Sequence, residues 1–150
     1  MDQDVIRARF ETAILEALDA IGEQPAAWGR DDCALWVADI VAKATGRDPA
    51  AAWRGRYNDR AGAARLLGPL GLGFALRRAA RACGWRHIAG SEADTGDIGL
   101  AMIPAVDDVG NIVRRPLTMI CRVRGWFVAR SEDGFVALDS AAIKSAWAAA

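Results

Sequence analysis

Cys33 is the residue in this sequence that is best placed to do chemistry. It follows the pair Asp31-Asp32 and opens a strongly apolar, helix-like run over residues 34–41. In the first turn of a helix, free backbone N–H groups and the positive end of the helix dipole favour the thiolate, the nucleophilic form of cysteine. The position therefore suits the nucleophile of a cysteine hydrolase. It also suits a purely structural role, because free cysteine is among the most frequently buried residues.

Two other residues, His87 and Asp32, bear on whether Cys33 can react. His87 is the single histidine of the chain and so the only imidazole that could take the proton of the thiol. Catalytic groups are defined by geometry rather than by chain position, so His87 stays open as a base although a surface or half-buried role also fits it. Asp32 is interpreted as the N-cap of the helix, because an adjacent carboxylate would raise the pKa of the thiol and oppose catalysis.

Composition excludes several other classes of site and partner. The three cysteines are odd in number and widely spaced, and one histidine cannot complete a zinc motif, so we expect no disulfide framework, no metal and no cofactor. Nineteen basic and nineteen acidic residues balance, which argues against nucleic acid as a partner. No apolar run is long enough for a membrane span, and the acidic beginning of the chain does not resemble a secretory signal.

The first half of the chain predicts helices that would position Cys33. Apolar residues recur at helical spacing from Asp4 to about Gly22. The Cys33 helix should run from about Asp32 to Thr45, with Asp31 or Asp32 as its N-cap, and end at Gly46. A short helix capped by Asn58 or Asp59 and a further helix from about Phe74 to Gly84 follow. A Gly/Pro cluster at residues 68–73 separates these two.

The second half predicts strands. Segments 85–88, 97–103, 117–123, 126–129 and 135–138 have strand character, and Pro104 should end the second of them. Ser140 is a suitable cap for a final helix that reaches Trp147. We therefore expect one α+β domain over residues 1–150, in which a helical lobe packs on a small antiparallel barrel or sheet with a C-terminal helix.

The tryptophans predict part of the core and part of a possible groove. Trp36 and Trp147 fall on apolar helical faces and are expected in the core. Trp28 and three further tryptophans lie near the ends of predicted elements, where aromatic side chains either pack at the rim of the core or line a groove. Trp28 and Asp32 are therefore the candidate binding residues beside Cys33.

The pattern around Cys33 resembles the NlpC-type cell-wall peptidase superfamily, a compact branch of the papain-like cysteine peptidases. The matching residues are Trp28-Gly29, Asp32-Cys33 and a downstream Gly96-Asp97 that opens a buried strand. The wider stretch over residues 28–39, with residues 45–49 and 54–57, is more similar to an uncharacterised branch that is typically encoded among phage or prophage tail genes. The resemblance covers about residues 25–147.

This resemblance implies a cysteine on a helix that packs against an antiparallel barrel, a histidine on the second barrel strand and a third polar group that orients the histidine. By that pattern the histidine would fall near Leu117 or Thr118, and neither residue can act as a general base. His87 belongs to a different element. The sequence thus departs from the family pattern at the catalytic base.

Two functions follow as expectations. In the first, the protein is a non-catalytic structural or binding component of a phage or prophage tail, made in the bacterial cytoplasm and carried in the virion with other tail proteins as partners. In the second, it is a cysteine peptidase or amidase that cleaves peptidoglycan stem peptides during phage entry, with Cys33 as nucleophile. An unrelated cytoplasmic role is a third possibility, because fold alone does not fix function.

Overall fold

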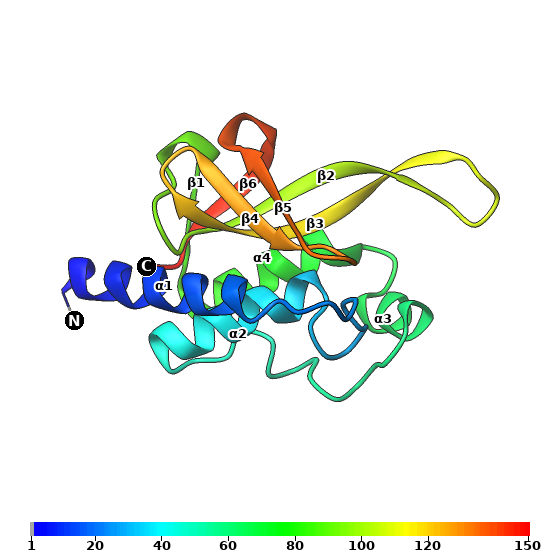
Figure 1. Cartoon of the computed structure of the whole chain (residues 1–150), viewed down its shortest axis with the longest axis horizontal. Coiled ribbons are helices and arrows are strands. Elements are labelled where there is room, and N and C mark those ends of the chain that lie inside the picture. Colours follow the sequence, from blue (N-terminus) through cyan, green and yellow to red (C-terminus); the bar gives the residue numbers. More distant parts are fainter. Residues whose placement is uncertain (1) are drawn as a thin grey trace.

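Helices come first and strands second in the computed structural model, which describes residues 2–150 (Figure 1). The helices are α1 (Gln3–Asp19), α2 (Cys33–Thr45), α3 (Arg60–Leu67) and α4 (Gly71–Cys83). The strands are β1 (Arg86–Ile88), β2 (Ile98–Val106), β3 (Ile112–Val123), β4 (Trp126–Arg130), β5 (Phe135–Asp139) and β6 (Ile143–Ala148). The predicted α+β class is confirmed.

The ends of the helices follow local rules that the sequence displays. Asp32 caps α2 by accepting a hydrogen bond from the backbone N–H of Leu35, and Asp59 caps α3 in the same way. Gly46 ends α2 in the left-handed conformation, with φ of 78°. The first helix begins earlier than predicted, because Asp2 rather than Asp4 is its N-cap.

The sheet is antiparallel and open, in the order β1-β6-β2-β3-β4-β5. The edge strands β1 and β5 do not pair with each other, so the strands form an open sheet and not a closed barrel. Both arrangements were compatible with the sequence. In Figure 1, α1 and α2 lie side by side beneath the strands. Across the described residues 2–150, no helix combines the length and the apolar character needed to cross a membrane.

Apolar residues of α1 and α2 pack against β2, β3 and β4 to form the main core. Its largest members are Phe10, Ile14, Trp36, Ile40, Ile98 and Ile120. A second cluster, around Met119 and Phe127, lies among the strands, and a third joins α4 to Leu100 and Trp147. Trp36 and Trp147 are both buried, as the sequence predicts.

The prediction of a C-terminal helix is wrong. Ser140–Ala142 forms only a single 3-10 turn, and Ile143–Ala148 is strand β6, which lies between β1 and β2. Pairing on both edges satisfies the backbone of β6, and Ala146 and Trp147 are buried in the sheet. This tertiary environment overrides the helix propensity of an alanine-rich segment.

Strands β2 and β3 extend further than predicted and form a two-stranded arm, defined here as residues 102–116. β2 continues through Pro104 to Val106, and β3 begins at Ile112 rather than near Leu117. Pro104 is tolerated because β6 pairs with β2 only as far as Ala101, so the outer edge needs no donor at residue 104. Figure 1 shows the arm projecting beyond the other strands.

Candidate functional site

Cys33 occupies the first position of α2, immediately after the N-cap. The Oδ1 atom of Asp32 accepts the Leu35 N–H at 3.1 Å, and its Oδ2 atom accepts the Gly29 N–H at 2.9 Å and the Tyr57 hydroxyl at 2.7 Å. Three donors therefore hold this carboxylate in place. The contacts support the interpretation of Asp32 as a helix cap, and they add a link to Tyr57, 25 residues away.

Tyr57 keeps its proton in this environment. Burial and the Asp32 carboxylate together raise the pKa of the Tyr57 hydroxyl, so that it remains a hydrogen-bond donor at neutral pH. A protonated phenol cannot accept the proton of Cys33. Tyr57 is thus a positioning residue for the loop and cap that precede α2.

Thr118 lies against the thiol of Cys33. It is a buried residue of β3 beside the Cys33 side chain, and its Oγ1 atom has no hydrogen-bond partner among the described residues. Burial raises the pKa of the Cys33 thiol and the Asp32 carboxylate adds to the rise, while the Thr118 contacts only partly oppose it. The position to which the resemblance assigns a histidine therefore holds a hydroxyl that cannot serve as a base.

The structure does not bring His87 to Cys33. His87 is exposed on β1, where it pairs with Trp147 of β6 and meets the indole edge-on at 5.9 Å between ring centroids. Strands β6 and β2 separate β1 from β3, which carries Thr118. Three strand spacings place β1 about 14 Å from β3. His87 on β1 is therefore far beyond hydrogen-bond reach of the Cys33 thiol, which lies beside Thr118 on β3.

Cys33 opens onto an apolar pocket of about 380 Å³ between the start of α2, the α3–α4 region and the base of the arm. Its lining includes the predicted residues Trp28, Asp32 and Cys33. It also includes Trp53, Tyr57, Leu66, Leu67, Leu72, Pro116, Arg60 and Arg115. This set is suited to bind an apolar group. Two guanidinium groups supply positive charge at the pocket, while the Asp32 carboxylate is already occupied by its three donors.

Several of these residues were not singled out from the sequence. The resemblance marks Thr118 only as a position that lacks the expected base. The sequence does contain an indication of the role of Tyr57, because this residue is the single tyrosine of the chain and ends the motif Arg54-Gly55-Arg56-Tyr57. Nothing in the sequence distinguishes Arg60 and Arg115 as site residues, since charged residues are common on solvated surfaces.

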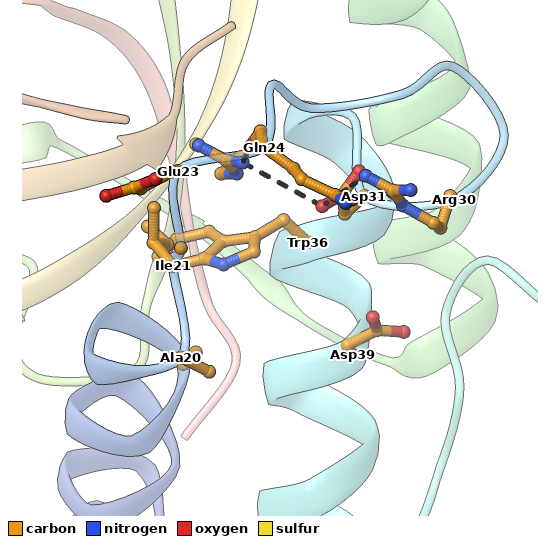
Figure 2. Close-up of a pocket in the computed structure, with 11 residues that line it drawn as sticks. Ala20, Ile21, Glu23, Gln24, Arg30, Asp31, Trp36 and Asp39 are labelled. Carbon is orange, nitrogen blue, oxygen red and sulfur yellow. Dashed lines mark hydrogen bonds and ion pairs between the residues drawn. The ribbon is translucent and has the colours of Figure 1, made fainter. Parts of the chain in front are cut away.

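The loop before α2 is fixed from its other side by Arg130. This buried side chain donates to the carbonyl oxygens of Gln24 at 3.1 Å and Gly134 at 2.7 Å, and it lies 3.9 Å from Asp31. Figure 2 shows Asp31, Gln24 and Trp36 around the adjacent cavity of about 430 Å³. Partial burial acts to raise the pKa of Asp31, but the Ala27 N–H and the Arg30 and Arg130 guanidinium groups lower it overall. The ion pair between Asp31 and Arg130 anchors the loop, and the Asp32 carboxylate remains available to cap the helix.

The Gly96-Asp97 pair of the resemblance serves a structural purpose. Asp97 is buried just before β2 and accepts hydrogen bonds from Arg7 and from the backbone of Asp94, Ala149 and Ala150. It faces Cys121, not Cys33, and it contributes to the raised pKa, about 12, of the buried Cys121 thiol, which follows mainly from burial. Within residues 2–150, no three His, Cys, Asp or Glu side chains converge as a metal site would require.

Alkylation of Cys33 should be slow at neutral pH. Because its pKa is raised, the thiolate fraction at pH 7 is smaller than for an ordinary cysteine, and the rate should keep rising with pH beyond pH 9. The measurement is the pH dependence of iodoacetamide labelling in a variant that retains Cys33 alone, through Cys83→Ala and Cys121→Ala. A variant that retains Cys83 alone is the reference. A plateau in the Cys33 rate below pH 8 would contradict the prediction.

Comparison with curated proteins and with solved structures finds no match. A family model described as a domain of unknown function, DUF6950, matches residues 7–149, which include most of α1, the other helices, the sheet, the pocket and Cys33. The chain belongs to this family.

Proposed function

We propose that this chain is a phage or prophage tail-associated protein in which an NlpC-like, papain-type fold acts as a structural or binding module and not as a peptidase. The observation that carries the non-catalytic part is the residue beside the Cys33 thiol, which is the buried Thr118 of β3 and not a base. A cysteine hydrolase needs a base within hydrogen-bond reach of its thiol, and here a buried threonine occupies that place.

The electrostatic environment of the thiol supports the same proposal. Catalytic cysteines have depressed pKa values and stand near cationic groups, whereas burial and Asp32 raise the pKa of Cys33. Removal of a general base costs on the order of a hundredfold or more in rate. The pocket beside the thiol is predominantly apolar, which is more typical of a binding surface than of a site for polar stem peptides.

The tail association rests on the sequence resemblance over residues 25–147. The helical lobe that packs on an antiparallel sheet, with Cys33 at the start of a helix facing a strand, is compatible with the NlpC-like architecture. The alternative, a peptidoglycan peptidase or amidase, is supported by the location of Cys33 in the first turn of α2 at an open pocket. In that case another subunit would have to supply the base.

Tail particles assembled with Cys33→Ala or, as a control, Cys83→Ala test this proposal. We expect both variants to be incorporated into particles at the wild-type level and to leave infectivity unchanged. We also expect purified wild-type protein to release no product from muropeptides, because the thiol lacks a base. Quantitative immunoblots of purified particles, plaque counts and chromatography of muropeptide digests provide the measurements.

Two outcomes would overturn the proposal in different ways. Absence of the protein from purified tails would remove the tail association. Wild-type incorporation of Cys33→Ala with a loss of infectivity, together with muropeptide cleavage by the wild-type protein, would establish the peptidase instead.

A further inference from the structure

The tip of the β2–β3 arm carries the most exposed apolar side chains of the described residues. Val109 and Ile112 are each 80% exposed and Val106 is 64% exposed, and among the large apolar residues only Leu70, at 65%, is comparable. Val106 pairs directly with Ile112 across the arm, so the three side chains lie at one end of the hairpin. A two-stranded ribbon has little stability of its own in water, and an apolar tip adds an unfavourable exposed surface.

The tip is also acidic. The turn contains Asp107 and Asp108, and the Asp107 carboxylate accepts the backbone N–H groups of Val109 at 3.0 Å and Asn111 at 2.8 Å. These bonds keep the turn in shape. Asp108 is fully exposed, and its one ion pair among the described residues is a 4.0 Å contact with Arg60.

The pocket beside Cys33 has the complementary character. It is lined by apolar side chains, and its cationic groups are the guanidinium groups of Arg60 and Arg115. Each makes only a long contact with the arm, from Arg60 to Asp108 at 4.0 Å and from Arg115 to the carbonyl oxygen of Val106 at 3.5 Å. An apolar segment that carries a carboxylate fits this combination. The sequence Val106-Asp107-Asp108-Val109 at the tip of the arm has that chemistry.

The tip of the arm does not lie in the pocket of its own molecule, because none of residues 106–112 lines that pocket. Pro116, at the base of the arm, lines the pocket, and the seven residue-to-residue steps from Val109 to Pro116 span about 23 Å when extended. Arg60 Nη1 reaches to 4.0 Å from Asp108 Oδ1 of its own chain, but both side chains are exposed and such a pair contributes little. Replacement of this ion pair by an equivalent one with a second molecule therefore costs little.

We infer that the apolar-acidic tip of the arm, residues 106–112, inserts into the pocket beside Cys33 of a second copy of this chain. The zero net charge of the protein permits self-association, because no overall repulsion opposes it. The inference rests on the proposed binding role of the pocket, but not on tail association or on the reactivity of Cys33. It assigns the apolar surface of the tip and the apolar surface of the pocket to one contact.

Sedimentation velocity from about 10 µM to 1 mM tests the inference, because a contact of this size is expected to be weak. We expect the wild-type protein to self-associate as concentration rises and to dissociate in 0.5 M salt, which screens the Asp–Arg pairs. Val109→Asp at the tip and Ala64→Glu at the pocket should each abolish association. Both residues are exposed, so neither change should prevent folding, which circular dichroism checks. Val5→Asp, at an exposed apolar site on α1, is the matched control and should associate like wild type.

A mixture of the two defective variants gives the decisive result. Ala64→Glu retains an intact tip and Val109→Asp retains an intact pocket, so the mixture should form a heterodimer through one contact although each variant alone is monomeric. Asp108→Arg should weaken association, and Arg60→Glu in the same chain should restore it.

The inference is overturned if the wild-type protein stays monomeric up to 1 mM, if Val109→Asp associates like wild type, or if the mixture remains monomeric. A monomer that is nonetheless incorporated into tails would assign the pocket to a different tail protein and would leave the proposed function intact. Self-association of a protein that is absent from tails would support the inference and would remove the proposed tail association.

Discussion

Replacement of Asp97 by alanine should lower the free energy of unfolding by about 3–5 kcal/mol, a large part of the 5–15 kcal/mol typical of a domain. The side chain is 1% exposed, and its carboxylate accepts four hydrogen bonds, from Arg7 at 2.9 Å, from Asp94 N at 2.9 Å, and from Ala149 N and Ala150 N at 3.1 and 3.4 Å. These donors belong to α1, to the turn before β2 and to the end of the chain. Without the carboxylate, buried donors and part of the Arg7 charge lose their partner.

The measurement is urea denaturation followed by tryptophan fluorescence, together with the melting temperature, which should fall by roughly 10 °C or more. Glu16→Ala is the control, because it removes an ion pair with Lys43 of similar length, 3.0 Å, between exposed side chains. That change should cost less than about 1 kcal/mol. Equal effects of the two substitutions would show that Asp97 does not hold the three segments together.

Features that depend on neighbouring residues were predictable from the sequence, and features that depend on the sheet were not. The caps at Asp32 and Asp59 and the stop at Gly46 are local, and all three are confirmed. The C-terminal segment has helix-forming composition, but its place between β1 and β2 makes it a strand. Its two partner strands are distant in sequence, so periodicity within the segment does not reveal them.

The candidate site divides in the same way. The sequence identified Cys33, Asp32 and Trp28, which the structure places in one pocket, because they surround a single helix start. The contact between Asp32 and Tyr57 depends on how the loop after α2 returns, and the contact between Cys33 and Thr118 depends on the packing of α2 against β3. Neither contact follows from the spacing of the residues along the chain.

The close approach of two loops at the site requires a glycine at position 29, and Gly29→Ala should lower the free energy of unfolding by about 3 kcal/mol or more. Gly29 has φ of 82°, which alone costs an alanine about 1–2 kcal/mol. A Cβ atom would in addition overlap the backbone carbonyl oxygen of Tyr57 and come within 3.2 Å of Asn58 Cα. Because the obstacle is backbone, the loops would have to separate, which would pull the Tyr57 hydroxyl from Asp32.

Gly55→Ala is the matched control that isolates this clash. Gly55 has a similar φ of 75°, and a Cβ atom there would meet open space, so its alanine variant should show only the conformational cost. The difference between the two variants in urea denaturation, about 1–2 kcal/mol, then measures the enforced contact between the loops. If both substitutions cost the same, Tyr57 does not press on Gly29 in solution, and Asp32 would be held by the backbone of its own helix start alone.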